Sequence, residues 1–527
     1  MKIANRKLFV LMIIIVCANA FSLDTTRVNI QQGEYWWAGV IDDGYQMPLT
    51  GHTAYQHNFL GNNKANQIQP LLLSNQGRYV WSEEPFEFRI DADRITLIHS
   101  SDIRVDKAGR TLKEAYLYAS EHFFPPSGDI PAALFFTHPQ YNTWIELTYD
   151  HNQRDILEYA QGIIDNGFPK GVFMIDDTWQ NDYGDWTFKA DRFPDPKAMV
   201  NQLKSMGFKV MLWVCPFVSA DSPNFRALNA SGGLLQTSQG KPALVEWWNG
   251  YSAVLDFTHP KGREWFRGEL ARLQNEYGID GFKFDGGDAN FYTGDVVSYV
   301  PTHANGHTEA WARFGLAYPY NEYRACWKLG GEALAQRLHD KHHNWEDVQQ
   351  LIPNSLLQGL SGYAFTCPDM IGGGEYKSFL NLNTMDEELV VRSAQCQALM
   401  PMMQFSVAPW RILSPENLKI CKAAADLHVE FGDLFLQLAR QSAQTGEPII
   451  RHLEYVFPDQ DYETINDQYM VGNEILVAPV LQSGARERLV TFPPGTWKDM
   501  NGVLYEGPAE IQVPAPLDVL PWFQRVD

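Results

Sequence analysis

Gly281-Phe282-Lys283-Phe284-Asp285-Gly286-Gly287-Asp288 decides the fold, because an apolar strand pattern ends there in a carboxylate that glycines follow. Residues 259–277, just before it, have a helical pattern with Gly278 as the stop signal. In a barrel of parallel strands, side chains at the carboxyl ends of the strands line the active site. Asp285 is therefore a candidate reacting group, although an acid after a short apolar run is more often a turn or helix-cap residue.

Strand and helix patterns alternate through the residues before this stretch. Apolar strand patterns cover residues 143–147, 171–175 and 209–214, and helical patterns cover residues 154–164 and 196–206. Such alternation implies a parallel sheet, and continuously apolar strands are buried on both faces, as barrel staves are. We therefore expect a barrel over residues 132–445. Its irregular segment at about 216–250, rich in Ser, Asn and Gly, is expected to be a loop insertion that covers the mouth.

Both flanks of the predicted barrel have β patterns instead. Short alternating runs such as Phe86-Glu87-Phe88-Arg89-Ile90 predict a β domain over residues 21–131, and runs such as Glu474-Ile475-Leu476-Val477 predict another over residues 446–527. Within the first domain, Tyr35-Trp36-Trp37-Ala38-Gly39 is interpreted as buried core rather than as a ligand edge.

The overall charge excludes one class of partner. The chain of 527 residues has a formal charge of −21 at pH 7 and no cluster of Lys and Arg, so nucleic acid would be repelled. Aromatic residues make up 13% and include 16 Trp, which either stack on sugar faces or fill a large core. A neutral or cationic partner is favoured, and the oligomeric state is not predicted.

The first residues are typical of a secretory signal. A basic start is followed by an apolar run from Leu8 to Val16 and by Ala18-Asn19-Ala20, so residues 1–20 predict a leader cleaved before Phe21. Lipid attachment at Cys17 is the less favoured alternative, because bulky Val16 precedes it. Export across an inner membrane to the periplasm is expected. No later run reaches about 18 apolar residues, so no transmembrane span is predicted.

Acidic residues recur where predicted strands end. Asp176, Asp177, Asp285 and Asp369 all follow short apolar runs. Clustered carboxylates either bind a cation or cleave a glycosidic bond as a nucleophile and an acid/base. No His-rich cluster, calcium-loop spacing or Cys pair spacing accompanies them, so no metal and no cofactor are predicted. Ser-His-Asp chemistry is weaker still, because no Gly-x-Ser-x-Gly motif occurs.

Four motifs together resemble glycoside hydrolase family 31. They are Asp176-Asp177 with Phe193-Pro194-Asp195-Pro196, then Phe282-Lys283-Phe284-Asp285, then Trp345 to Asp369-Met370-Ile371-Gly372-Gly373, and finally Gln468-Tyr469-Met470-Val471-Gly472-Asn473. They follow the order of the family and cover most of the chain. The resemblance implies an N-terminal β-sandwich, a central (β/α)8 TIM barrel and a C-terminal β-domain. It also implies a retaining α-glycosidase.

The resemblance assigns the reacting pair. It implies that Asp285 is the nucleophile and that the acid/base lies five residues before Trp345, at Asp340. An Arg sixteen residues before the acid/base holds the sugar in the family, and Arg324 has that spacing, with Arg337 as its rival. The ionised Asp285 and the protonated Asp340 then require surroundings that push their pKa values in opposite directions.

Further residues are candidates for binding the sugar. Asp176 and Asp177 would accept hydrogen bonds from hydroxyls, with a helix-cap role as the alternative. Trp144, Trp247 and Trp248 are expected as stacking walls, with core packing for at least one of them. Lys283 either keeps Asp285 ionised or forms a structural ion pair. Asp369 either touches the sugar or supports the rim of the barrel.

Part of the chain resembles one branch of the family more closely, the branch of the myogenesis-regulating glycosidase. Asn142-Thr143-Trp144 and Trp247-Trp248-Asn249-Gly250 carry this likeness, and Gln404 and Ser406 stand where typical α-glucosidases have an Arg and a sugar-binding His. The branch is associated with α-galactosides, so the prediction is an exo-acting α-galactosidase for oligosaccharides or glycosides. An α-glucosidase, an α-xylosidase or a non-catalytic carbohydrate-binding protein are the alternatives.

Overall fold

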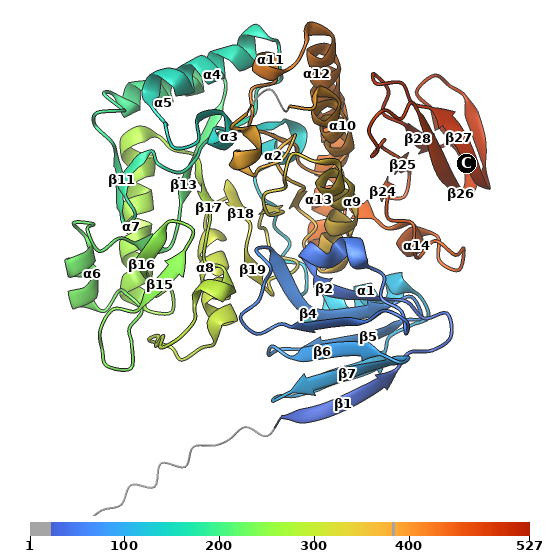
Figure 1. Ribbon diagram of the computed structural model, residues 1–527, viewed down its shortest axis with the longest axis horizontal. Helices are drawn as coiled ribbons and strands as arrows, with labels where there is room; N and C mark the ends of the chain where they lie inside the picture. Colours follow the sequence, from blue (N-terminus) through green and yellow to red (C-terminus); the bar gives the residue numbers. More distant parts are fainter. Residues whose placement is uncertain (1–22, 382–384) are drawn as a thin grey trace, which may run out of the picture.

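A single parallel sheet forms the centre of the computed structural model, which describes residues 23–381 and 385–527 (Figure 1). Its eight strands pair in the order β21-β20-β18-β17-β13-β10-β9-β22, and a bridge between Met370 and Gln404 nearly closes it into a barrel. The strands are β9 Gln140–Asn142, β10 Val172–Ile175, β13 Lys209–Val214, β17 Gly281–Phe284, β18 Asn321–Tyr323, β20 Gln336–Arg337, β21 Thr366–Cys367 and β22 Gln404–Phe405. This confirms the predicted (β/α)8 barrel. The predicted leader and Cys17 lie outside the described residues.

Helices surround the barrel, most of them between successive strands and the last two after β22. They include α4 Gln153–Asp165, α5 Pro196–Ser205, α7 Pro260–Tyr277, α8 Ala304–Gly315, α9 Trp345–Leu360, α10 Glu387–Ala398, α12 Pro415–Glu430 and α13 Gly432–Thr445. Helix α7 begins with Pro260 in its first turn and ends at Gly278, whose φ of 79° is the left-handed conformation of a C-cap. Gly278, which the sequence predicts as a stop signal, therefore ends α7 as expected.

The first predicted barrel strand is wrong in its position. Strand β9 ends at Asn142, and Trp144–Leu147 is the one-turn helix α3. The Asn142 side chain accepts a hydrogen bond from the Trp144 N–H at 2.8 Å. An Asn side chain that binds the backbone two residues on forms a turn, so the apolar run leaves the sheet early.

The segment expected to be irregular contains a small antiparallel sheet. Strands β14 Phe217–Val218, β15 Leu244–Trp247 and β16 Gly250–Val254 pair in the order β14-β16-β15, and α6 Phe225–Ser231 lies between β14 and β15 in the chain. The strands are short and lie between Ser, Asn and Gly residues. Their period-two pattern was therefore too brief to predict.

Two sheets make up the N-terminal part, as the predicted β-sandwich requires. One contains β1 Asp24–Asn29, β3 Tyr55–Asn58, β6 Glu87–Asp91 and β7 Arg94–His99. The other contains β2 Trp36–Val40, β4 Gln67–Ser74, β5 Arg78–Ser82, β8 Ile103–Lys107 and also β19 Cys326–Trp327, which comes from the barrel part. Trp36 and Trp37 are buried, as their interpretation as core requires.

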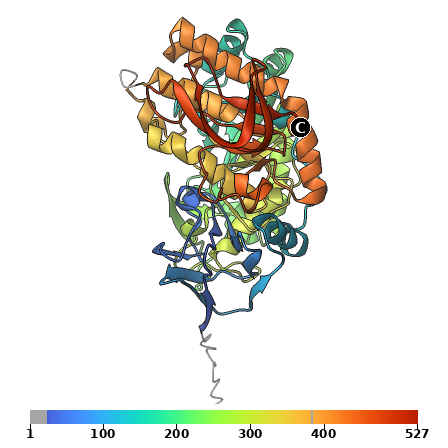
Figure 2. The ribbon, with the colours of Figure 1, turned by 90° about the vertical axis from the view of Figure 1, so that its right-hand side faces the viewer.

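A six-stranded antiparallel sheet forms the C-terminal domain. Its order is β23-β24-β25-β28-β26-β27, with β23 Ile450–Arg451, β24 Tyr469–Val471, β25 Ile475–Val477, β26 Glu487–Asp499, β27 Leu504–Pro514 and β28 Trp522–Arg525. Figure 2 shows it in front of the barrel helices. Buried Arg392 of α10 joins the two parts by donating hydrogen bonds to the carbonyls of Ala515 and Val519.

None of the helices in the described residues is long and apolar enough to cross a membrane.

Candidate active site

A cavity of about 420 Å³ opens at the carboxyl ends of the barrel strands, and we call it the barrel-mouth cavity. Its volume is in the range typical of small-molecule sites. Eight of the predicted site residues line it: Trp144, Asp176, Asp177, Trp248, Lys283, Asp285, Arg324 and Asp340. Trp247, Arg337 and Asp369 do not line it. The remaining contacts of each residue show what it can do.

Asp285 directly follows β17 and lies among positive groups and hydrogen-bond donors. The Trp213 indole N–H donates to its Oδ2 at 3.0 Å, and Arg324 Nε is 3.4 Å from its Oδ1. Burial alone raises the pKa of Asp285, but the charges of Lys283, Arg324 and Arg337 outweigh it and hold this pKa well below its usual range. The carboxylate is thus ionised at any ordinary pH, as an attacking carboxylate must be.

Lys283 makes its shortest ion pair with another acid. Its Nζ is 2.7 Å from Asp176 Oδ2 and 4.0 Å from Asp285 Oδ2. Asp176 and Lys283 are both buried, and the other oxygen of Asp176 accepts the Asp177 N–H at 2.9 Å. Both roles considered for Lys283 therefore occur together, with the structural ion pair as the closer contact.

Asp177 is a buried acceptor that lines the barrel-mouth cavity. It accepts hydrogen bonds from Gln180 Nε2 at 2.8 Å, from the Tyr183 hydroxyl at 3.0 Å and from the Thr178 N–H at 2.6 Å. Burial raises the pKa of Asp177 to about 6. Among the helices of the described part, neither Asp176 nor Asp177 is an N-cap, so the helix-cap alternative is wrong.

Asp340 is more exposed than Asp285, and Arg337 connects it to Asp369. Arg337 Nη1 donates to Asp340 Oδ1 at 2.8 Å and to Asp369 Oδ1 at 2.9 Å. The Asp340 side chain is 38% exposed, whereas Asp369 is buried and its Oδ2 accepts the N–H groups of Lys341 and Gly374. Burial raises the pKa of Asp369 to about 7, with Arg337 opposing the shift. Arg337 therefore bridges Asp340 to Asp369, which does not itself line the barrel-mouth cavity.

Arg337 is held from behind by residues inside the barrel. Its Nε is 3.5 Å from Glu322 Oε1, and the other oxygen of Glu322 accepts a hydrogen bond from Gln404 Nε2 at 2.7 Å. Ser406 Oγ accepts the Ile145 N–H at 2.7 Å. Gln404 and Ser406 are thus occupied by protein partners, and neither lines the barrel-mouth cavity.

Aromatic rings form two walls of the cavity. Trp144 packs edge-on against Tyr149 and Tyr376, with ring centroids 5.4 and 5.5 Å apart. Trp248 is 47% exposed and lies under the Arg324 guanidinium, 5.6 Å from its ring centroid. Trp247 is buried and stacks on Phe217 at 4.1 Å, so it packs in the core, the alternative considered for one of the three.

Several residues of the site were not predicted from the sequence. Asp288 binds Arg324 through both oxygens at 3.0 and 2.8 Å. Its position at the end of the motif Gly281–Asp288 was the sequence signal that could have identified it. Asn66 of the N-terminal domain accepts the His339 N–H at 2.8 Å, next to Asp340. Asn66 and His339 are so far apart in the chain that no local pattern connects them.

Metal ligands are not gathered within residues 23–381 and 385–527. There, no group of three or more His, Cys, Asp or Glu side chains is arranged to hold a metal ion.

Comparison with known proteins relates the chain to one family. The profile described as "Glycosyl hydrolases family 31 TIM-barrel domain" matches residues 139–433, and the one described as "Glycosyl hydrolase family 31 C-terminal domain" matches residues 446–527. Among solved structures, a GH31 dextranase of Flavobacterium johnsoniae complexed with glucose superposes with a TM-score of 0.83 at 22% identity, over 95% of this chain and 66% of that one. This second likeness concerns the fold alone.

Two curated relatives are similar in sequence over most of the chain. The myogenesis-regulating glycosidase of Mus musculus is 34% identical over 427 residues, which are 78% of this chain and 59% of that protein. Alpha-glucosidase 2 of Bacillus thermoamyloliquefaciens is 28% identical over 406 residues, 70% of this chain and 50% of that protein. The chain thus spans about half to three fifths of the length of these relatives.

Proposed function

Because the chain belongs to glycoside hydrolase family 31, we propose that it is a retaining α-glycosidase that removes a terminal α-linked sugar from an oligosaccharide or glycoside. One observation carries this proposal. Asp285, kept ionised by Lys283 and Arg324, lines the same cavity as the more exposed Asp340. A retaining glycosidase needs two such carboxyl groups with different surroundings.

The chemistry proceeds in two displacements. Asp285 attacks the anomeric carbon and forms a glycosyl ester, while Asp340 gives its proton to the oxygen of the departing group. Water then enters, loses a proton to Asp340 and cleaves the ester, so Asp285 is regenerated and the configuration is retained. Arg337, hydrogen-bonded to Asp340 at 2.8 Å, orients the acid/base through both steps.

The buried part of the cavity lining supports action on a chain end. Asp176, Asp177 and Lys283 line it and are themselves buried, so a bound sugar meets protein on that side. Such a site accepts one terminal sugar whose hydroxyls hydrogen-bond to the carboxylates.

An α-galactoside is the proposed substrate. Gln404 and Ser406 replace the Arg and His of typical α-glucosidases, and both are engaged by protein partners outside the cavity. The 34% identity to the myogenesis-regulating glycosidase supports membership of the branch that the sequence motifs resemble, and it is that resemblance which implies α-galactosides. The second candidate, an α-glucosidase or α-xylosidase, is favoured by the similarity to alpha-glucosidase 2. A non-catalytic sugar-binding protein is disfavoured, because Asp285 and Asp340 are both present.

A panel of aryl glycosides tests the proposal. The chain is assayed with the aryl α-galactoside, α-glucoside, α-xyloside and α-N-acetylgalactosaminide, and kcat/KM is compared. We expect the galactoside to be favoured about tenfold or more, as expected when one well-placed hydrogen bond distinguishes two sugars. A clear preference for the glucoside contradicts the choice of sugar. Hydrolysis that survives Asp285→Asn contradicts the assignment of the nucleophile.

Residues 1–20 support a further proposal, that the protein is exported to the periplasm. Fractionation of the producing cells, with sequencing of the mature N-terminus, is the test. A mature chain that begins at Phe21 in the periplasmic fraction supports it, and an intact leader in the cytoplasmic fraction contradicts it.

A further inference from the structure

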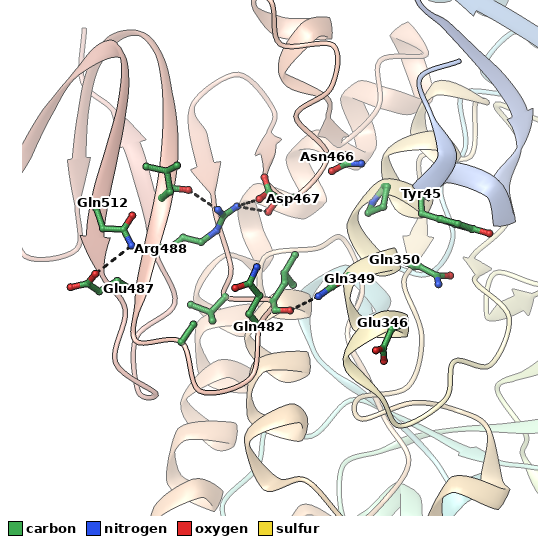
Figure 3. Close-up of a pocket in the computed structure, with 15 residues that line it drawn as sticks. Tyr45, Glu346, Gln349, Gln350, Asn466, Asp467, Gln482, Glu487, Arg488 and Gln512 are labelled. Atoms are coloured by element: carbon green, nitrogen blue, oxygen red, sulfur yellow. Dashed lines mark hydrogen bonds and ion pairs between the residues drawn. The ribbon is translucent and has the colours of Figure 1, made fainter. Parts of the chain in front are cut away.

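A second cavity, of about 610 Å³, lies where the three parts of the molecule meet, and we call it the interdomain cavity (Figure 3). Tyr45 from the 3₁₀ helix η1 Ile41–Gln46 lines it on the N-terminal side. Helix α9 lines a second side, and segments of the C-terminal part around residues 466–467 and 480–489 line the rest. It shares no lining residue with the barrel-mouth cavity.

Three carboxamides of this cavity have unused hydrogen-bonding groups. The side chains of Gln350, Asn466 and Gln482 make no hydrogen bond with any described residue of the chain. Each amide offers two donors and one acceptor oxygen. Gln350 comes from α9 and the other two come from the C-terminal part, so Figure 3 shows them around one opening rather than along one element. A ligand with many hydroxyl groups would pair with them.

The charges around the cavity exclude an anionic ligand. Its one cation, Arg488, is 2.7 Å from the carboxylate of Asp467 and is already paired. Glu346 and Glu487 add two further carboxylates to the lining. These would repel a phosphate or a carboxylate ligand, but they would accept hydrogen bonds from neutral hydroxyl groups.

An exposed aromatic ring supplies the apolar face. Tyr45 is 46% exposed and Leu489 is 47% exposed, and both line the cavity. A flat ring packs against the C–H face of a sugar, while amides and carboxylates bind its hydroxyls. The cavity thus offers hydrogen-bond partners for hydroxyl groups, an apolar face and no unpaired cation. These properties are complementary to a neutral saccharide.

We propose that the interdomain cavity is a second saccharide-binding site, which holds a neutral oligosaccharide outside the barrel-mouth cavity. The proposal goes beyond the hydrolysis proposed above, and it does not depend on which sugar reacts at Asp285. Helix α9 begins five residues after Asp340 and lines the interdomain cavity, so one segment of the chain connects the two sites. A saccharide held there would keep the enzyme on a multivalent substrate between turnovers.

Calorimetric titration of the full chain tests the proposal. The parent carries Asp285→Asn, so the probes raffinose and maltotriose are not consumed. At least one of the two is expected to give two binding events. In the parent with Gln350→Ala and Gln482→Ala added, we expect one event to weaken about 30-fold, because two amides that each contribute about 1 kcal/mol are lost.

Two further variants control this comparison. Gln202→Ala, an exposed Gln on α5, is the matched control and should leave both events unchanged. Trp248→Ala, in the barrel-mouth cavity, should weaken the other event and spare the interdomain one. Equal unfolding temperatures verify that every variant is folded. A single event with both probes, or two events that the paired Gln variants leave unchanged, overturns the proposal. Absence of hydrolysis with a second event intact would instead contradict only the proposed function.

Discussion

Asp285 and Asp177 line one cavity, yet their surroundings shift their pKa values in opposite directions. Asp285 is close to Lys283 and Arg324, and its pKa is lowered despite burial. Within the described residues no cation lies at ion-pair distance from Asp177, and burial raises its pKa to about 6. As pH rises, Asp285 therefore becomes ionised at a much lower pH than Asp177. We therefore expect any titration of activity near neutral pH to arise from groups other than Asp285.

Asp177→Asn tests this difference through the pH dependence of activity. In the wild type, kcat/KM should fall as pH drops through about 6, because protonated Asp177 no longer accepts a charge-assisted hydrogen bond from the sugar. The variant should be about 10- to 100-fold less active and should lack this limb. Asp191→Asn, at an exposed position, is the control. A variant that keeps the limb near pH 6 contradicts the role of Asp177.

The same group predicts a pH dependence of stability. A carboxyl whose folded pKa is raised favours the folded state when protonated, and this contribution is lost as pH rises through the folded pKa. The wild type should therefore lose stability relative to Asp177→Asn as pH rises through about 6. Unfolding temperatures of both proteins across this range measure it. An opposite trend means that Asp177 is ionised well below this pH.

The turn after β17 explains, at the level of elements, why glycines follow Asp285. Gly286 and Gly287 have φ angles of 69° and 74°. A Cβ on Gly286 would lie 2.7 Å from the Phe217 ring, and one on Gly287 would lie 2.5 Å from the Trp311 ring. Only glycine has both the backbone freedom and the lack of side chain that this turn needs. The turn also directs the Gly286 N–H to Asp285 Oδ1 at 2.9 Å.

Gly287→Ala should move this turn and the carboxylate that it holds. We expect a loss of stability of about 1–3 kcal/mol from the left-handed backbone and the clash with Trp311, together with a large loss of kcat. Gly268→Ala is the matched control, because Gly268 lies in α7 with nothing near its missing Cβ. That change should be neutral or slightly stabilising. Equal behaviour of the two variants in thermal unfolding and turnover contradicts this account of the turn.

Elements with strong patterns could be predicted from the sequence, and short ones could not. The pattern over residues 209–214 became β13, and the one over residues 196–206 became α5 with one residue fewer. Strand β20 has only two residues, so Asp340 beyond it was assigned by resemblance and not by pattern. Of the adjacent Trp247 and Trp248, only Trp248 lines the cavity. The sequence does not predict which of the two does so, because the answer depends on the register of β15.

At the scale of the whole molecule, the N-terminal domain completes the candidate active site. The Ala65 carbonyl accepts a hydrogen bond from Arg324 at 2.6 Å, and Gln67 Nε2 donates to the carbonyls of Arg324 and Arg337. Asn66 binds both the backbone and the ring of His339, beside Asp340. The barrel strands alone therefore do not fix the residues around the acid/base.

Asn66→Ala should loosen the segment that carries Asp340. Loss of its hydrogen bonds to His339 should lower kcat/KM about tenfold. The loss should grow with the pKa of the leaving phenol, because poor leaving groups depend most on protonation. Asn29→Ala, at an exposed position on β1, is the control and should not change the rates. An equal loss for good and poor leaving groups argues against a role for Asn66 in positioning the acid/base.

The order of the three parts was predictable from the sequence, whereas their contacts were not. A change from period-two patterns to alternating strands and helices marks the barrel, because each type of element must bury a different face. Asn66 and His339 are 273 residues apart, and Gln67 and Arg337 are 270 apart. Side chains so distant meet only through the packing of whole domains, which no local pattern records.

Covalent trapping of the nucleophile is the measurement that tests the central claim most directly. A fluorinated α-glycosyl fluoride of the preferred sugar forms the glycosyl-enzyme quickly and releases it slowly, so the labelled peptide can be sequenced by mass spectrometry. We predict one label per chain, on Asp285, and none in Asp285→Asn. A label on Asp176 or Asp177, or rapid turnover without any label to a product of inverted configuration, would contradict the account.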